Sequence, residues 1–471
     1  MRTCSPSPSV DALEPRRLFA FDFAYAAQFV GNGDFTPTGI ATDADANVYV
    51  TGIFAGTADF NFAKSKVHML DAADGPAFVA KYDANGTLVW ARQFGKGAGG
   101  SATPRNVVVD AWGGVYVVGE FGGTVDLHPD NGFLANHTAS GNADAFVIKL
   151  RPTGEFRFAN AVATPDDETV TNGAAVDEAG NVYFGGTLVH GGASDRSFAA
   201  KFNGNGKAQW VDTFGDGVMT VRFHAVAVDA AGGVYLAGEA PGGVDLDPSP
   251  TGSAPLAGLA DFILKLDVDG AYVWTDPLAY TGDDAGITHL TTDALGNLYA
   301  AGEFRGTYDF NPSSRKTHNV TTNGHEDGFV AKYLPDGGFS FARGIGGGDH
   351  DFADGVAVDT VTGDVLVAGR FTGKAYFNRE FSAFRLYADG ILFDDYLARY
   401  TADGDFVNAV RLGNADQDGP ALLATAPGGV AYLFGTLSGA TPLDLDPNAR
   451  TRSLLNSDPG NTDGYLLSLL V

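Results

Sequence analysis

The chain has 471 residues, of which 44% are hydrophobic and 18% are charged, so it can bury a core and is not disordered throughout. It has 30 Lys and Arg residues and 57 Asp and Glu residues, which gives a formal net charge of −27. This charge argues against nucleic acid as a partner, because the protein and the nucleic acid would both be strongly anionic. No apolar run reaches about 18 residues, so we expect no membrane insertion, and the single cysteine, Cys4, rules out an intramolecular disulfide and a cysteine-based zinc site.

The first 20 residues differ from the rest of the chain. They contain no apolar stretch of about 7–15 residues, so they do not form an ordinary secretory signal peptide. Beyond them, 64 glycines and 34 phenylalanines favour many short strands and tight turns. We expect residues 1–20 to be a disordered targeting-like segment and residues 21–471 to form a single domain.

The first predicted strand, residues 23–31, has no partner in its own part of the chain. Its sequence AYAAQFVG (24–31) resembles LVWARQFG (88–95), which ends a longer motif. No sequence that corresponds to the earlier part of that motif precedes residues 24–31. The chain therefore begins with the last element of a repeating unit.

From residue 39 onward, one unit recurs seven times. Each unit predicts four strands, A to D, joined by short turns rich in Gly, Asn and Asp; in the fourth unit they are residues 226–229, 234–239, 261–267 and 271–278. Strand A ends at an aspartate in six units, with Thr425 in the seventh: Asp43, Asp110, Asp177, Asp229, Asp293 and Asp359. Strand B carries a glycine: Gly52, Gly119, Gly186, Gly238, Gly302, Gly369 and Gly435. Antiparallel units of this kind are typical of β-propeller blades.

The seventh unit ends with strand C at residues 463–471. Its missing strand D is the unpartnered strand 23–31, in which Tyr25 takes the position of Trp90. We therefore predict an all-β fold, a seven-bladed β-propeller of four-stranded antiparallel blades. The N-terminal strand completes the last blade, closes the ring and removes an open sheet edge.

The repeated phrase VAVDAAGGVYLAGE with DFILKLDVDGAYVW resembles the SBBP repeats of bacteria, which are relatives of NHL repeats. The resemblance covers residues 21–471 and implies a seven-bladed propeller in a secreted or cell-surface protein, without a shared catalytic motif. Residues 13–19, LEPRRLF, also resemble the LEPR-XLL motif at the N-termini of exported bacterial proteins, with Phe19 where Leu is usual. Both resemblances imply a bacterial protein that is secreted or held at the cell surface.

Strand C carries a basic residue three positions after its aromatic residue in six units, and Ser468 in the seventh: Lys81, Lys149, Lys201, Lys265, Lys332 and Arg399. The seventh unit is also the one that lacks the strand A aspartate. Strands A and C are separated by strand B and lie about 10 Å apart. We predict Asp–Lys pairs within the blades, the alternative being that each column caps its own turn.

A second acidic motif follows strand B, as in VDLDP at 244–248. Residues two apart in an extended stretch point the same way, and pairs of oxygen ligands suit Ca²⁺. The alternative is an Asx-type turn fixed by the following proline. The candidate metal ligands are Asp126, Asp245, Asp247, Asp309, Asn311, Asp444 and Asp446.

The loops between strand D and the next strand A are also acidic. In a propeller they share one face with the long B–C loops, and they approach the central axis. Varied loops on a rigid scaffold often bind ligands, so we predict a site for a cation or a cationic ligand there, the alternative being solvated loop charge. The candidate residues are Asp283, Asp284, Asp349, His350, Asp351, Asp416 and Asp418.

No sialidase box, G-x-S-x-G, H-E-x-x-H or P-loop motif occurs. The sequence therefore favours a non-catalytic, exported or cell-surface propeller that serves as a binding or scaffold module. We expect a monomer whose partner is an extracellular protein or glycan, and no cofactor other than calcium. The alternative is a carboxylate-based hydrolase or lyase that acts on extracellular polysaccharide at the long-loop face.

Overall fold

The computed structural model describes residues 21–471 with short gaps. The residues outside the description are 1–20, 64–65, 98, 130–134, 164–167, 191–193, 216, 279, 282–284, 314, 379–383, 389–391, 414–418, 420, 440–441, 447–452 and 457–459. The predicted targeting-like segment therefore lies outside the described residues.

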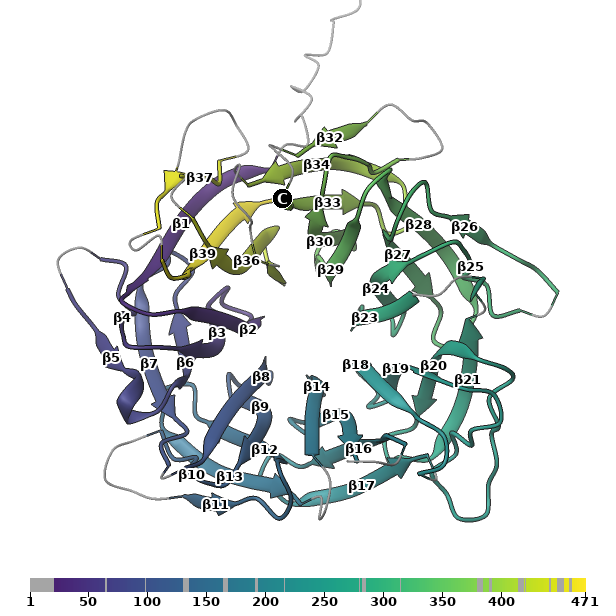
Figure 1. The fold of residues 1–471 in the computed structure, drawn as a ribbon, viewed down its shortest axis with the longest axis horizontal. Helices are drawn as coiled ribbons and strands as arrows, with labels where there is room; N and C mark the ends of the chain where they lie inside the picture. Colours follow the sequence, from purple (N-terminus) through teal and green to yellow (C-terminus); the bar gives the residue numbers. More distant parts are fainter. Residues whose placement is uncertain are drawn as a thin grey trace, which may run out of the picture.

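Four-stranded antiparallel sheets stand side by side in a ring (Figure 1). Blade 1 consists of β2 (Phe35–Thr42), β3 (Val48–Phe54), β6 (Ala77–Tyr82) and β7 (Leu88–Phe94). Blade 2 consists of β8 (Ser101–Val109), β9 (Val115–Gly122), β12 (Asp144–Leu150) and β13 (Phe156–Val162). Blade 3 consists of β14 (Glu168–Val176), β15 (Val182–Val189), β16 (Arg196–Phe202) and β17 (Ala208–Phe214). Blade 4 consists of β18 (Arg222–Val228), β19 (Val234–Ala240), β20 (Ala260–Leu266) and β21 (Tyr272–Leu278).

Three further blades complete the ring. Blade 5 consists of β23 (Ala285–Thr292), β24 (Leu298–Phe304), β27 (Asp327–Tyr333) and β28 (Phe339–Gly347). Blade 6 consists of β29 (Asp351–Val358), β30 (Val365–Phe371), β33 (Asp394–Tyr400) and β34 (Phe406–Leu412). Blade 7 consists of β35 (Leu422–Ala426), β36 (Val430–Leu437), β39 (Asp463–Leu470) and β1 (Asp22–Gly31). These four strands are strands A to D of each blade, with A innermost and D outermost (Figure 1), so the predicted seven-bladed propeller is confirmed.

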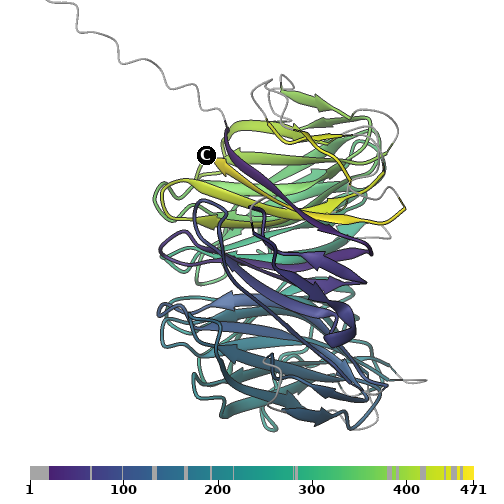
Figure 2. The ribbon, with the colours of Figure 1, turned by 90° about the vertical axis from the view of Figure 1, so that its left-hand side faces the viewer.

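β1 closes the ring, as predicted. It pairs antiparallel with β39, from Asp22 opposite Leu470 to Phe29 opposite Gly464, and Figures 1 and 2 show the purple strand beside the yellow one. Tyr25 lies opposite Ser468, just as Trp90 lies opposite Lys81 in blade 1. The two ends of the described chain therefore build one blade together.

Hairpins in the B–C loops join neighbouring blades. They are β4 (Thr57–Asp59) with β5 (Met69–Asp71), β10 (Thr124–Asp126) with β11 (Asn136–Thr138), β25 (Thr307–Asp309) with β26 (Asn319–Thr321), β31 (Lys374–Tyr376) with β32 (Arg385–Tyr387), and β37 (Leu443–Asp444) with β38 (Ser453–Leu454). The B–C loop of blade 1 also contains η1 (Ala72–Asp74), a 3-10 helix, and the D–A loop between blades 4 and 5 contains β22 (Tyr280–Thr281). The first strand of a hairpin pairs with the end of strand D of the preceding blade: β4 with β1, β25 with β22, and β31 with β28. Backbone hydrogen bonds thus cross the blade boundaries, including the closure.

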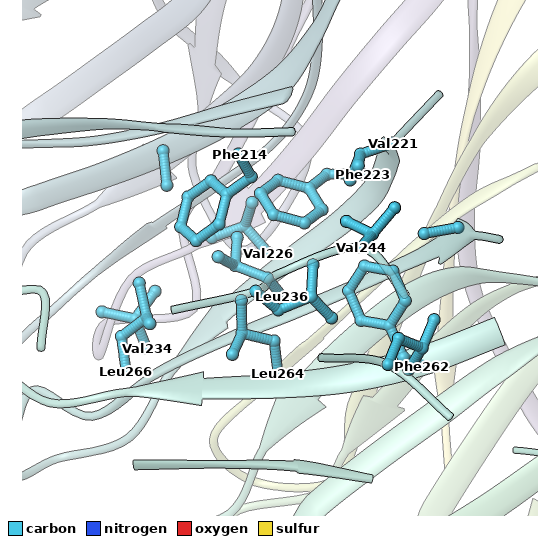
Figure 3. Packing of buried hydrophobic residues seen from close by; sticks show 14 of the residues in the cluster. Phe214, Val221, Phe223, Val226, Val234, Leu236, Val244, Phe262, Leu264 and Leu266 are labelled. Carbon is cyan, nitrogen blue, oxygen red and sulfur yellow. The ribbon is translucent and has the colours of Figure 1, made fainter. Parts of the chain in front are cut away.

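Apolar side chains fill the space between adjacent blades. Figure 3 shows the boundary of blades 3 and 4, where the rings of Phe214 and Phe223 have centroids 4.9 Å apart above Leu236 and Leu264. At the closure, Phe29 of β1 stacks on Phe35 of β2 with centroids 4.7 Å apart. Each boundary between blades has a buried cluster of this kind.

The strand D aromatic residue of one blade packs against the C–D turn of the next. A Cβ atom on Gly154, which has φ 81°, would come 2.7 Å from the ring of Trp90, so both the backbone and the space require glycine. Tyr25 makes the same contact with Gly86 across the closure, at 2.8 Å. Blade 6 has Asn408 at this position, and the next blade has no C–D turn, because its strands C and D are β39 and β1.

No helix in the described part of the chain is long and apolar enough to cross a membrane.

Candidate functional site

The two faces of the ring differ in their loops. The A–B and C–D turns are short and lie on one face, whereas the D–A loops and the B–C loops with their hairpins lie on the other, the long-loop face. Because strand A is innermost, its first residues bring side chains from every blade toward the axis at the long-loop face.

Strand A carries a β-bulge near the long-loop face in six blades. The bulged residues are Thr38, Arg105, Asn172, His224, Thr288 and Asp354. The bulge accounts for the glycine column, because in these blades a Cβ atom on that glycine would lie 1.9–2.3 Å from a strand A carbonyl oxygen. A bulge also redirects side chains, and a central cavity of about 540 Å³ is lined by Thr38, Arg105, Asn172 and Thr288.

Ion pairs connect these bulges to the residue that follows the glycine on strand B. In blade 2, Arg105 pairs with Glu120 at 2.6 Å (Nη2 to Oε1). In blade 6, Arg370 pairs with Asp354 at 2.7 Å (Nε to Oδ2), with a second bond from Nη2. Burial raises the pKa of Glu120, although the hydrogen bond from Arg105 opposes this shift. The charged groups at these two bulges are therefore held in fixed pairs, and one of them, Arg105, lines the central cavity.

A third pair crosses from one blade to the next. Arg222, at the start of strand A of blade 4, contacts Glu239 at 3.1 Å and Asp195 of blade 3 at 2.7 Å. Burial lowers the pKa of the neighbouring His224, so this imidazole is neutral at pH 7. We call the three groups of paired charges the inner rim: Arg105, Glu120, Asp195, Arg222, Glu239, Asp354 and Arg370.

One carboxyl group near the inner rim has a strongly shifted pKa. Burial raises the pKa of Asp261, at the start of strand C of blade 4, to about 7; the Glu239 and Glu303 carboxylates add to the shift, and a hydrogen bond from Tyr308 opposes it. A shifted carboxyl can act as an acid or a base if a substrate can reach it. Asp261 is only 1% exposed, so its environment is that of the core.

Two imidazoles and a carboxylate meet at the boundary of blades 5 and 6. His325 and Glu326 precede strand C of blade 5, and His350 lies in the following D–A loop. Their ligand atoms lie within 4.8 Å of one another. His350 Nδ1 hydrogen-bonds Glu326, and Arg305 lies 3.8 Å from the other oxygen of this carboxylate. These three residues could hold a metal ion.

The structure describes three of the seven predicted ligand-binding residues. Asp283, Asp284, Asp416 and Asp418 lie outside the described residues. Asp349 and His350 are exposed on the loop between β28 and β29, whereas Asp351 is fully buried and accepts the N–H of Gly347 at 2.7 Å. Asp351 therefore stabilises the loop between β28 and β29 through this hydrogen bond. Ligand binding by its two exposed neighbours, Asp349 and His350, stays a prediction.

The predicted calcium ligands stabilise the B–C loops. Asp309 Oδ1 accepts the N–H groups of Asn311 and His318, at 3.1 and 2.8 Å. The same arrangement recurs around Asp126 and Asp245, and Asp444 accepts the N–H of Asp446. Asp247 and Asn311 each accept the N–H two residues on. These are Asx-type turns, which were the alternative interpretation; calcium binding stays a prediction.

The predicted Asp–Lys pairs are present in three blades. They are Asp43–Lys81 at 3.4 Å, Asp110–Lys149 at 3.1 Å and Asp229–Lys265 at 3.2 Å. In blades 3 and 5 the lysine donates instead to a carbonyl oxygen of the next blade, Lys201 to Val268 and Lys332 to Ala402. Arg399 of blade 6 pairs with Asp364. The prediction of six pairs was therefore wrong for these three blades; in blades 2 and 4 the lysine makes both the ion pair and a bond to a carbonyl oxygen of the next blade.

Sequence reasoning missed the inner rim, although one signal was visible. Glu120, Glu239, Glu303 and Arg370 each follow the glycine of strand B directly, so charge recurs at one point of the unit. It also missed His325 and Glu326, for which no local motif exists.

Comparison with known sequences gives no family. No family model matches the chain, and the search of curated proteins also found no match. The resemblance to SBBP repeats therefore stays a prediction.

Several solved structures align with most of this chain at low sequence identity. Virginiamycin B lyase from Staphylococcus aureus matches with 9% identity and a TM-score of 0.43, covering 94% of this chain and 99% of that chain. Sqt1 from Chaetomium thermophilum matches with 10% identity and a TM-score of 0.43, covering 96% and 100%. The phage phi92 endosialidase matches with 10% identity and a TM-score of 0.41, covering 96% and 69%.

Proposed function

We propose that this chain is a non-catalytic, exported or cell-surface propeller that binds an extracellular protein or glycan through its long-loop face. The proposal rests mainly on the inner rim, in which Arg105–Glu120, Arg370–Asp354 and the contacts of Arg222 hold the charged groups in pairs. Arg105 lines the central cavity, and fixed, paired charges give a ligand hydrogen-bond partners in defined positions.

The chemistry of the carboxyl groups favours binding over catalysis. A general acid or base needs a shifted pKa together with access to the substrate. Near the inner rim, Asp261 has a strongly raised pKa but lies in the core, and Glu120 is occupied by Arg105. A hydrolase or lyase remains the second candidate, because Glu239 and Glu303 are both close enough to Asp261 to raise its pKa.

The same proposal includes a secreted or cell-surface location and the binding of calcium at the long-loop face. The LEPR-like residues 13–19 and the SBBP-like repeats support a secreted or cell-surface location. The acidic D–A loops, with Asp349 exposed, would attract a cation such as Ca²⁺ to the same face.

The test uses one purified sample of the full chain in a glycan array and in a hydrolysis screen over the same polysaccharides. We expect retention of a glycan without product release. Arg105→Ala should weaken that binding at least about tenfold, the loss of roughly one good charged contact. The matched control is Arg151→Ala, which removes an exposed arginine from a C–D turn on the other face. Turnover of any polysaccharide would overturn the non-catalytic assignment, and equal binding by both variants would move the site away from the inner rim.

A further inference from the structure

Three side chains with metal-ligating atoms converge from two loops on the long-loop face. His325 and Glu326 lie between β26 and β27, and His350 lies between β28 and β29. The imidazole rings of His325 and His350 stack with centroids 4.5 Å apart and an interplanar angle of 15°. In the described part of the chain, this is the one group of three His, Cys, Asp or Glu residues with ligand atoms close enough for a metal ion.

The backbone holds these two loops together. The N–H of Asp351 donates to the carbonyl oxygen of Glu326 at 2.9 Å and so joins the two loops; the carbonyl oxygen of His350 accepts the N–H of Thr372, just after β30, at 3.1 Å. At the point of closest approach, a Cβ atom on Gly324 would lie 2.2 Å from the carbonyl oxygen of Gly348. Only a glycine at position 324 therefore lets the loops approach so closely, which brings His350 beside the other two ligands.

The donor set favours one class of metal. Two imidazole nitrogens and one carboxylate oxygen suit Zn²⁺ and its first-row neighbours, whereas Ca²⁺ and Mg²⁺ prefer sites made of oxygen alone. The Glu326 side chain is 15% exposed and hydrogen-bonds His350 Nδ1. Its carboxylate oxygen and the two imidazole nitrogens lie within 4.8 Å of one another, close enough to share one ion.

We propose that His325, Glu326 and His350 bind a single zinc ion. Arg305, next to the second oxygen of Glu326, orients this carboxylate from outside the ligand set. Three protein ligands leave one position of a tetrahedral zinc ion open to water or to a donor atom of a ligand. The ion would also link the B–C loop of blade 5 to the D–A loop that leads into blade 6. This site is independent of the glycan or protein binding proposed above.

The test measures Zn²⁺ binding by calorimetry and the shift of the melting temperature with Zn²⁺. The full chain carries Cys4→Ser, so that its one thiol does not contribute. We expect one zinc ion per chain and a melting temperature that rises with Zn²⁺ but not with equal Mg²⁺. His325→Ala and His350→Ala should each lower the affinity at least about tenfold. Neither substitution changes the formal charge, so general attraction of Zn²⁺ to the acidic surface stays constant.

Two further variants separate ligation from folding. His68→Ala, which removes a histidine from a B–C loop of blade 1, should leave Zn²⁺ binding unchanged. Gly324→Ala keeps all three ligands but forces the loops apart, so it should also weaken Zn²⁺ binding. Equal affinity in the parent and in both ligand variants would overturn the site, as would the absence of any Zn²⁺ binding; in that case the cluster is an ion pair that only joins the loops.

Discussion

In five blades, a lysine of strand C lies over the ring of a strand B tyrosine. The Nζ atoms are 4.4–5.1 Å from the ring centroids, within the range of cation–π attraction. In blade 4, Lys265 also donates to the hydroxyl of Tyr235 at 2.7 Å, and this hydroxyl donates to Asp229. Lys265 reaches the carbonyl oxygen of Pro335 in blade 5 as well. One cation therefore connects three strands of a blade to the next blade.

A double-mutant cycle tests this pairing. Lys265→Ala and Asp229→Ala should each lower the free energy of unfolding by about 1–3 kcal/mol, because a partner is left without its counter-charge in a largely buried place. The double mutant should cost less than the sum by about 0.5 kcal/mol or more, as measured by urea denaturation. Lys201 and Asp177 of blade 3 are the control, since Lys201 bonds Val268 and their coupling should be smaller. Additive effects in blade 4 would contradict the pairing.

The pKa of Asp261 predicts a change of stability with pH. The folded-state pKa of about 7 lies well above the usual value of an aspartate, so the folded state binds the extra proton. The associated stability is complete below about pH 4 and is lost as the pH rises through 7. Asp261→Asn keeps an acceptor for Tyr308 and removes the titration. Its stability relative to the parent should therefore rise by about 3 kcal/mol between pH 5 and pH 8, in urea denaturation at both values.

Asp269→Asn, an exposed site in the same blade, should show no such rise; a flat profile for Asp261→Asn would refute the assignment.

At the scale of elements, the hairpins of the B–C loops depend on their first aspartate. Asp309 closes the β25–β26 hairpin through two backbone hydrogen bonds, and β25 pairs with β22 of the preceding blade. The acidic motif thus stabilises a hairpin that joins two neighbouring blades.

Two substitutions of Asp309 separate the turn from calcium. Asp309→Ala removes both hydrogen bonds and should lower the free energy of unfolding by about 1–2 kcal/mol. Asp309→Asn keeps the acceptor oxygen and should cost less than about 0.5 kcal/mol. Thermal unfolding in Ca²⁺ and in NaCl of equal ionic strength completes the test. A stabilisation by Ca²⁺ that Asp309→Asn abolishes would show that the motif also binds calcium, and equal losses in both variants would contradict the turn account.

The elements could be predicted because each blade repeats one hydrophobic pattern. The spacing of the aspartates from Asp43 to Asp359 identified strands A and B, and Tyr25 identified the closing strand. The charge that recurs after the strand B glycine was visible in the sequence, but its partners in the inner rim could not be predicted, because a bulge such as that at Arg105 inserts one residue without a distinct local signal. The meeting of His325 with His350 depends on the close approach of two loops at Gly324, which only the folded ring reveals.

At the scale of the whole molecule, blade 7 is assembled from both ends of the described chain, and the contacts on each side of it fit this interruption. Tyr25 packs on Gly86 across the closure in place of a tryptophan. At the boundary of blades 6 and 7, where no C–D turn exists to receive an aromatic ring, the corresponding residue is Asn408. At these two boundaries, the strand D residue is therefore aromatic where the next blade has a C–D turn, and it is an asparagine where that turn is absent.

The central claim is that β1 closes one rigid ring, which in turn holds the long-loop face in place. Deleting residues 1–20 leaves β1 whole, whereas deleting residues 1–31 removes strand D of blade 7, the contact of Tyr25 with Gly86 and the stack of Phe29 on Phe35. The direct measurement is the melting temperature of these two truncations. We expect the shorter deletion to melt within about 2 °C of the full chain, and the longer one to melt at least about 5 °C lower or to aggregate through the exposed edge of β39. Equal melting temperatures for the two truncations would contradict closure by β1.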